Sequence, residues 1–106
     1  MPRWAAKVDG TQKAVVEALR AYGWTVVSLS RMGGGVPDLL IAKDGRTVLV
    51  EVKTKKGKLR FAQEAFLATW PGSWSILRSV QDVQDFDENV RNLPAMWSIM
   101  RGTGAH

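Results

Sequence analysis

Three residues in the middle of the chain, Asp38, Glu51 and Lys53, are of the types that carry out metal-assisted hydrolysis. Asp38 begins one strand-like run, and Glu51 and Lys53 stand two residues apart near the end of the next. Because successive side chains of a strand point to opposite faces, Glu51 and Lys53 share one face with Leu49. A carboxylate and an ammonium group therefore project together near a strand end.

Taken singly, these residues also have ordinary structural interpretations. A Glu-x-Lys pair is common on protein surfaces, where it stabilises a fold only weakly, and Asp38 follows Val36-Pro37 in a plausible turn. The segment between the two runs, residues 43–46, carries an Asp-Gly hairpin signal. Antiparallel partners place their outer ends together, so we expect Asp38 to lie beside Glu51.

Two carboxylates that converge on one point repel each other unless a cation lies between them. Their hard oxygen atoms suit Mg²⁺ or Mn²⁺ rather than zinc. Such a cation binds a phosphodiester oxygen and acidifies an attacking water, while Lys53 positions that water or neutralises charge on the phosphate. The chain has no cysteine and its single histidine is His106, which argues against a zinc site and a Ser-His mechanism. The pattern therefore predicts hydrolysis of phosphodiester bonds.

The elements around these residues follow from hydrophobic periodicity and turn signals. We expect helices over residues 11–22, 59–70 and 79–93, and strands over residues 24–29, 38–42, 47–53 and 74–77. Ser79 is expected to cap the last helix, with Asp82 at the capping-box position. The order α-β-β-β-α-β-α predicts an α/β fold in which helices flank a mixed four-stranded sheet.

The length of 106 residues fits one domain, which we assign to residues 8–93. The apolar tail over residues 94–106 is too short for its own core, so we expect it to pack on the domain or to contact a partner, such as a second copy in a homodimer.

Charge indicates the kind of partner. Fifteen Lys and Arg against ten Asp and Glu give a net charge of +5 and a pI near 10.0. This balance favours nucleic acid, and acidic membrane surfaces are a weaker alternative. No stretch approaches the roughly 20 apolar residues of a membrane span, and the N-terminal residues do not form a signal peptide. We therefore expect a cytoplasmic protein without a membrane partner.

The motif residues occur in an order that resembles the VRR-NUC branch of the PD-(D/E)xK nucleases. In chain order they are Gly35-Val36-Pro37-Asp38, Glu51-Val52-Lys53, Gly57-Lys58-Leu59 and Gln63. The resemblance covers about residues 8–91, and the expected element order is similar to the family core. That branch includes stand-alone phage and bacterial proteins of this size, and archaeal Holliday-junction resolvases are relatives.

The resemblance implies a PD-(D/E)xK restriction-endonuclease-like core and a metal site formed by Asp38, Glu51 and the backbone carbonyl of Val52, with Lys53 as the catalytic lysine. It also implies that Gln63 lies beside the catalytic centre. By periodicity Gln63 interrupts the apolar stripe of its helix, so its amide needs a partner. A buried amide bonded to the backbone would leave the same pattern, and the sequence does not separate the two roles.

The family usually carries a glutamate on the first helix, at the position that Gln12 occupies. Helical geometry places Gln12 within about 20° of Leu19 on the inward face and Glu17 on the solvent side, so Gln12 is the better candidate ligand. Its amide oxygen adds no charge, which predicts weaker metal affinity or a lower rate. The alternative is that Gln12 caps the helix by reaching back to Asp9.

A basic run follows the Glu51 strand. Its members Lys55, Lys56, Lys58 and Arg60 are expected to contact DNA phosphates on either side of the scissile bond. A charged loop is often only solvated, and such contacts give affinity without sequence readout. The glycines at 33–35 resemble a phosphate loop, but no Gly-Lys-Ser/Thr and no dinucleotide fingerprint follows, which argues against a nucleotide cofactor.

Three functions are consistent with these patterns. The first is a Mg²⁺- or Mn²⁺-dependent DNA endonuclease that acts on branched or otherwise structured DNA as a homodimer, since two sites on a twofold axis match a four-way junction. The second is a DNA-binding module with a nuclease-like fold and weak or no cleavage, as the neutral Gln12 suggests. The third is a phage-type protein that uses the fold to bind a host factor.

Overall fold

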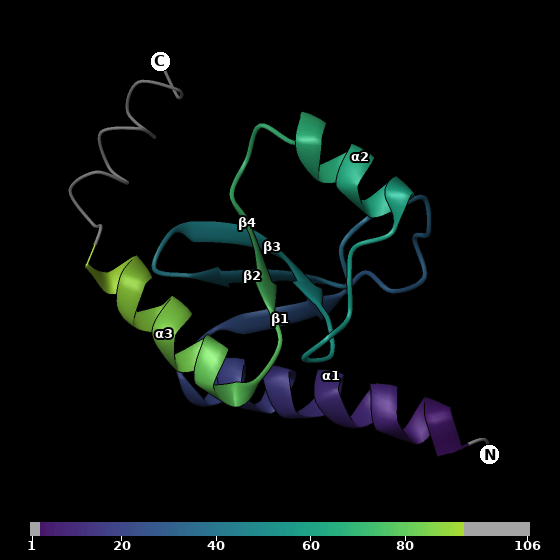
Figure 1. Cartoon of the computed structure of the whole chain (residues 1–106). Helices are drawn as coiled ribbons and strands as arrows, with labels where there is room; N and C mark the ends of the chain where they lie inside the picture. Colours follow the sequence, from purple (N-terminus) through teal and green to yellow (C-terminus); the bar gives the residue numbers. More distant parts are fainter. Residues whose placement is uncertain (1–2, 93–106) are drawn as a thin grey trace.

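Seven elements follow one another in the computed structural model, which describes residues 3–92 and, for side chains, residues 10–92. They are α1 (Arg3–Ala21), β1 (Thr25–Ser28), β2 (Leu39–Lys43), β3 (Arg46–Val52), α2 (Phe61–Thr69), β4 (Trp74–Leu77) and α3 (Val80–Arg91) (Figure 1). The expected order and the α/β class with a mixed four-stranded sheet are confirmed. No helix in the described part of the chain is long and apolar enough to cross a membrane.

The sheet has the order β1-β2-β3-β4. The strand β2 runs antiparallel to both β1 and β3, and β4 runs parallel to β3. The β2–β3 hairpin turns at Asp44 and Gly45, both with positive φ (52° and 80°), as a two-residue type I′ turn requires. This turn sets a register in which Leu39 pairs with Val50. The start of β2 therefore lies beside the end of β3.

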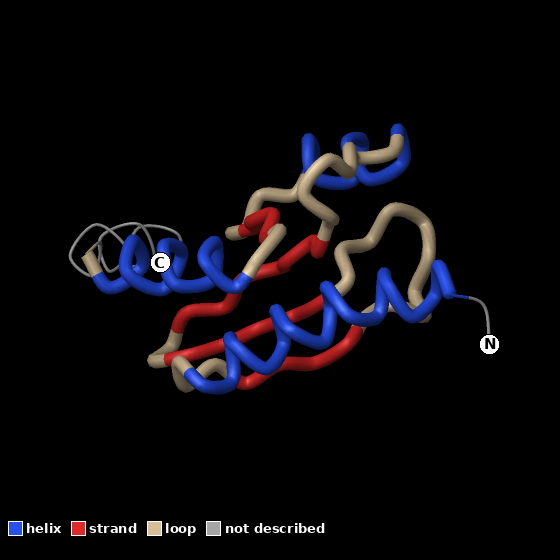
Figure 2. Tube along the Cα trace, turned by 60° about the horizontal axis from the view of Figure 1, so that its bottom comes forward, coloured by secondary structure: helices blue, strands red, loops and turns tan. Residues whose placement is uncertain are grey.

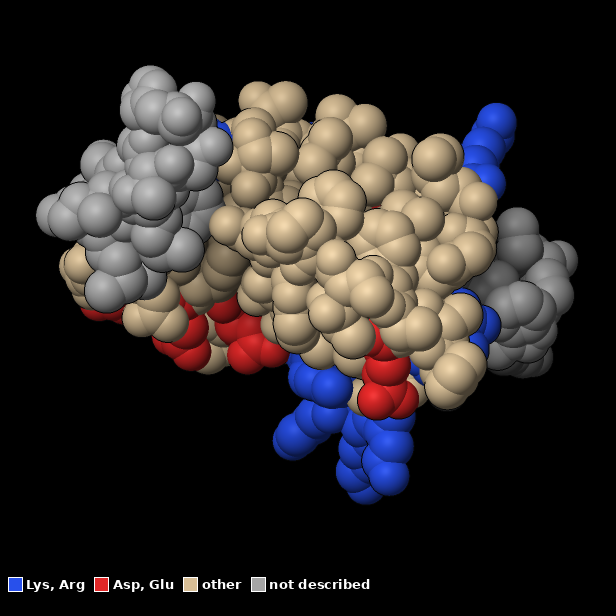
Figure 3. All heavy atoms as spheres, turned by 90° about the horizontal axis from the view of Figure 1, so that it is seen from above, with Lys and Arg blue, Asp and Glu red and all other residues tan. Residues whose placement is uncertain are grey.

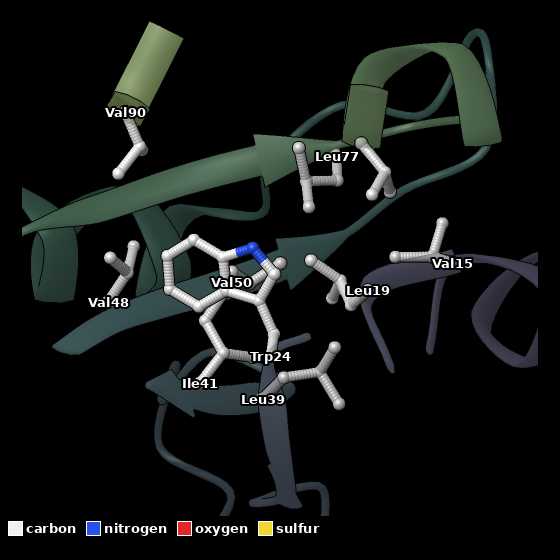
Figure 4. Packing of buried hydrophobic residues seen from close by; sticks show 10 residues of the cluster. Val15, Leu19, Trp24, Leu39, Ile41, Val48, Val50, Leu77 and Val90 are labelled. Carbon is white, nitrogen blue, oxygen red and sulfur yellow. The ribbon is translucent and has the colours of Figure 1, made fainter. Parts of the chain in front are cut away.

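The helices lie on both faces of the sheet (Figures 1 and 2). One face carries α1 and α3, and the main core lies between these helices and the strands, with Trp24 at its centre (Figure 4). The shorter α2 lies on the other face and buries Leu67 and Gln63. Leu49 and Glu51, which alternate with the core residues Val48 and Val50 along β3, are also buried. Glu51 is therefore buried on the α2 side of the sheet rather than on an open surface.

A buried acidic residue ties α3 to the sheet. Asp87 is 2% exposed, and its Oδ1 accepts hydrogen bonds from Trp24 Nε1 and Lys43 Nζ, both at 2.9 Å. Arg91 lies 3.3 Å from its other carboxylate oxygen. Burial alone would raise the pKa of Asp87, but the bonds from Lys43 and Trp24, together with the charges of Lys43 and Arg91, outweigh burial and lower this pKa.

Two expected helix starts and one capping contact are corrected. The first helix begins at Arg3 rather than near Thr11. The second begins at Phe61, after the N-cap residue Arg60. Ser79 caps α3 as expected, but the Asp82 carboxylate accepts from the backbone N–H of Arg78, one residue before the cap, at 2.8 Å. Leu93 and the tail over residues 94–106 lie outside the described residues.

Candidate active site

The hairpin brings Asp38 to Glu51, as the sequence predicts. Asp38 stands immediately before β2, and the pairing of Leu39 with Val50 places it at the end of β3. Its Oδ2 accepts a hydrogen bond from the backbone N–H of Val52 at 2.9 Å. This bond fixes the carboxylate of Asp38 against the strand that carries Glu51.

Glu51 is the most buried charged residue beside Asp38 and Lys53, with 3% exposure. Its Oε2 accepts a hydrogen bond from Gln63 Nε2 at 2.8 Å and lies 3.4 Å from the ammonium of Lys53. Its Oε1 is buried and has no hydrogen-bond partner among the described residues. One oxygen is therefore held by neighbours, and the other has no partner in the part of the chain that the structure describes.

Electrostatics at Glu51 oppose the charged form. Burial is the largest cause and the negative charge of Asp38 the second, and together they raise the pKa of Glu51 above its ordinary value. The ammonium of Lys53 lowers this pKa in part. A cation beside Oε1 of Glu51 would offset both the cost of burying its charge and the repulsion from Asp38.

Gln63 combines the two roles that the sequence left open. Its Oε1 accepts from the backbone N–H of Arg60 at 2.8 Å, as the third residue of a helix does in a capping box. Its Nε2 donates to Glu51. Because the backbone bond fixes which end of the amide faces Glu51, Gln63 presents a donor to the carboxylate. It positions Glu51 through a helix start rather than through a flexible loop.

A cavity of about 390 Å³ opens at these residues. It is lined by Thr11, Gln12, Asp38, Glu51, Val52, Lys53, Thr54, Lys58, Arg60 and Gln63. The structure thus gathers the expected acidic pair, the lysine, the two glutamines and part of the basic run. Lys55 and Lys56 do not line this cavity, whereas Thr11 and Thr54, which sequence reasoning did not single out, do.

Gln12 faces the cavity from α1, and Glu17 is exposed outside it. The alternative in which Gln12 caps its helix from Asp9 is wrong, because α1 begins at Arg3 and both residues lie within the helix. Gln12 therefore stands at the cavity wall as an interior residue of α1. A short hydroxyl side chain, Thr11, precedes it on the same wall.

Arg78 holds the basic loop in place. Its Nη1 donates to the carbonyl oxygens of Thr54 at 2.8 Å and of Gly57 at 2.5 Å. Lys55, Lys56 and the other basic side chains of this segment are exposed. Figure 3, which looks onto the side that carries α2, shows Lys and Arg side chains projecting together from one edge of a largely uncharged face. The loop backbone is thus fixed while its ammonium groups reach into solvent.

The glycine-rich loop between β1 and β2 packs on α2. Gly35 has φ of +81°, and a Cβ atom at this position would overlap the backbone carbonyl of Ala62, the second residue of α2. Gly34, its neighbour, has φ of +63° and open space around it. Gly35 therefore allows the close approach of this loop to the helix start that carries Gln63.

The donor atoms fit a hard divalent cation. Among the side chains that the structure describes, those of residues 10–92, no group of three or more His, Cys, Asp or Glu could hold a metal ion. The cavity is lined by two carboxylate residues, Asp38 and Glu51, and by Val52 and Gln12, which carry neutral oxygens. Oxygen donors of this type suit Mg²⁺ or Mn²⁺. The unpartnered Oε1 of Glu51 is the atom that such a cation would satisfy.

The fold is similar to that of a solved VRR_NUC domain. The two chains are 26% identical, superpose with a TM-score of 0.63, and match over 77% of this chain and 95% of the other. No family model and no curated protein matches the sequence. The resemblance that the motif residues indicate is therefore confirmed by the structure, and with it a nuclease-like fold.

Proposed function

We propose that this chain, whose fold is that of a VRR_NUC nuclease-type domain, is a metal-dependent endonuclease that hydrolyses phosphodiester bonds in branched or otherwise structured DNA. One observation carries the proposal. Glu51 is a buried carboxylate, held beside a second carboxylate in an open cavity, and one of its oxygens has no partner among the described residues. A fold that needed Glu51 only for structure would satisfy both of its oxygens.

In this proposal Asp38, Glu51 and the backbone carbonyl of Val52 hold Mg²⁺ or Mn²⁺. When bound, the cation supplies a Lewis acid for the phosphodiester and lowers the pKa of an attacking water. Gln63 keeps Glu51 in position by its hydrogen bond. The Lys53 side chain is 15% exposed, and its ammonium lies 3.4 Å from Glu51 Oε2, where it would offset negative charge that grows on the phosphate.

The basic segment supplies affinity for the DNA backbone. Lys58 and Arg60 line the cavity and would contact the phosphates nearest the scissile bond. Lys55 and Lys56, exposed on the loop that Arg78 anchors, would reach phosphates farther along. These contacts carry no base readout, which supports recognition of DNA shape rather than sequence.

A DNA-binding module with weak cleavage is the second candidate. It is favoured by Gln12, which gives the cavity a neutral amide where a third carboxylate would strengthen metal binding. Under this alternative the protein grips DNA through the same basic segment. Gln12→Glu separates the two, because a third carboxylate would raise metal affinity and cleavage if Gln12 faces the cation.

A homodimer with two such sites, matched to a four-way junction, and a cytoplasmic location are proposals that rest on the sequence. Sedimentation of the full chain with and without a four-way junction tests the dimer. A monomer under both conditions would contradict it.

Cleavage assays test the main proposal. A four-way junction, a flap and a plain duplex are incubated with the chain in Mg²⁺, Mn²⁺ or EDTA, beside Asp38→Ala and Lys53→Ala. We expect metal-dependent cutting that both substitutions abolish, with the branched substrates preferred. Binding without metal-dependent cleavage would favour the second candidate, and cleavage that neither substitution changes would contradict this site.

A further inference from the structure

Phe61 is the most exposed of the large hydrophobic side chains described, at 87%. A single exposed hydrophobic residue is ordinary on a protein surface and by itself indicates nothing. Phe61, however, is the first residue of α2, directly after Arg60 and two residues before Gln63, both of which line the cavity. Phe61 itself does not line the cavity, so a ligand touches both only if it fills the cavity and extends past Arg60 onto the ring.

The backbone at Phe61 is held rigidly relative to Glu51. The N–H of Arg60 bonds to Gln63, and Gln63 bonds in turn to Glu51. From the other side Gly35 packs against the carbonyl of Ala62. The residues before and after Phe61 are therefore fixed, while its ring lies almost wholly in solvent. An aromatic ring presented in this way has a rigid base and an open face.

The surrounding charge indicates what covers the ring. Arg60, the residue before Phe61, and Lys58 line the cavity, and Lys55 and Lys56 lie exposed a few residues earlier. An apolar protein surface would have to be matched to this cluster of cations, whereas a nucleotide provides both partners at once. Its phosphate pairs with the cations, and its base has an apolar face that stacks on an aromatic ring.

Within a continuous duplex the faces of each base are covered by its neighbours. An aromatic side chain can stack on a base only where that stacking is interrupted, as at a flap, a branch or a frayed end. We infer that Phe61 is a stacking platform for an unpaired base next to the scissile phosphate, and that this contact selects interrupted DNA over continuous duplex. The inference rests on the proposed function and adds a base-binding subsite to it.

Fluorescence of 2-aminopurine placed at the unpaired position of a flap DNA tests the contact, with the full chain in EDTA so that nothing is cut. The parent is expected to quench the probe on binding. Phe61→Leu, which keeps an apolar side chain without a ring face, should lose the quench and bind the flap about tenfold more weakly, within the range for removal of a stacked aromatic. Phe61→Trp should keep both the quench and the affinity for the flap.

Two controls isolate the ring. The affinity for continuous duplex should stay the same in Phe61→Leu. Val80→Ala provides the matched variant, because Val80 is also the exposed first residue of a helix, at 51%, but neither of its neighbours in the sequence lines the cavity, whereas Arg60 does. It should leave both the quench and the flap affinity unchanged.

Two results would overturn the inference in distinguishable ways. In the first, the parent cuts flap DNA, and Phe61→Leu still quenches the probe and still prefers the flap. The stacking contact is then absent and the proposed nuclease function stands, and contact with another protein becomes the remaining role for Phe61. If the parent binds neither flap nor duplex, the proposed function fails and the subsite fails with it.

Discussion

The close packing of Gly35 on α2 leads to a prediction with an internal control. Gly34 and Gly35 are neighbours, and both have positive φ, of +63° and +81°. An alanine at either position has the same backbone cost, about 1 kcal/mol for a left-handed conformation. Only at Gly35 would the new methyl group also overlap another part of the chain, the carbonyl of Ala62.

The overlap sets the size of the expected difference. Placing an extra methyl group in a packed site costs about 1–3 kcal/mol, because the neighbouring backbone must move. Gly35→Ala should therefore be about 2 kcal/mol less stable than Gly34→Ala, which corresponds to roughly 10 °C in Tm for a domain of this size. The backbone that must move is the first turn of α2, so the displacement also reaches Gln63 and its bond to Glu51.

Thermal unfolding of the two variants and single-turnover cleavage of a flap DNA measure these effects. Gly34→Ala should lose little activity, and Gly35→Ala should lose both stability and rate at temperatures where it remains folded. Equal melting temperatures for the two variants would refute the reasoning, because they would mean that the loop does not press on α2.

Three other predictions concern charged side chains. In EDTA the parent should lose stability as pH rises from about 4.5 through the raised pKa of Glu51, because ionisation of the buried carboxyl is unfavourable in the folded state. Glu51→Gln should lack this loss and should be at least as stable as the parent near neutral pH. If urea unfolding gives the two proteins the same dependence of stability on pH, the raised pKa is contradicted. The lowered pKa of Asp87 gives the opposite sign, so its contribution is present above the ordinary carboxyl pKa and is lost as pH falls below about 4. Asp87→Asn should be about 3 kcal/mol less stable at neutral pH, because it leaves the charge of Lys43 uncompensated. Its free energy of unfolding should also change less than that of the parent as the pH falls below about 4. Equal stability of the two proteins at neutral pH would argue against the ion pair. Arg78→Ala should weaken DNA binding several-fold and speed tryptic cleavage after Lys55 and Lys56, because it frees the loop carbonyls, and unchanged proteolysis would show that the loop needs no anchor.

Local sequence signals predicted much of the fold. The Asp44-Gly45 pair predicted the hairpin, and the observed positive φ at both residues explains why: few other dipeptides adopt this turn without strain. The turn then determined the register and the approach of Asp38 to Glu51. The run Trp74–Leu77, bounded by Pro71-Gly72, was predicted with its observed limits.

The errors lie at the starts of helices. Apolar residues repeat at helical spacing only after Thr11, so the first helix was predicted to begin later than Arg3. Leu59 and Arg60 were assigned to the second helix, but the Gln63 side chain takes the N–H of Arg60 and places the cap there. A one-dimensional pattern does not show which donor an amide will choose.

Other features depend on contacts between distant residues. Arg78 reaches Thr54 across 24 positions, and Trp24 reaches Asp87 across 63. Nothing near Arg78 in the sequence indicates that it anchors a loop. Likewise the burial of Glu51 depends on α2 covering the outer face of β3, which follows only once the helix is placed.

The role of Glu51 is tested most directly by the Mg²⁺-dependent rate of flap cleavage for the parent and for Glu51→Gln, with melting curves to verify that the variant is folded. The proposal predicts that the variant is folded and cuts roughly a thousandfold more slowly, because it lacks the carboxylate that holds the cation. A variant that cuts within about tenfold of the parent rate would contradict the claim that Asp38 and Glu51 form a catalytic metal site.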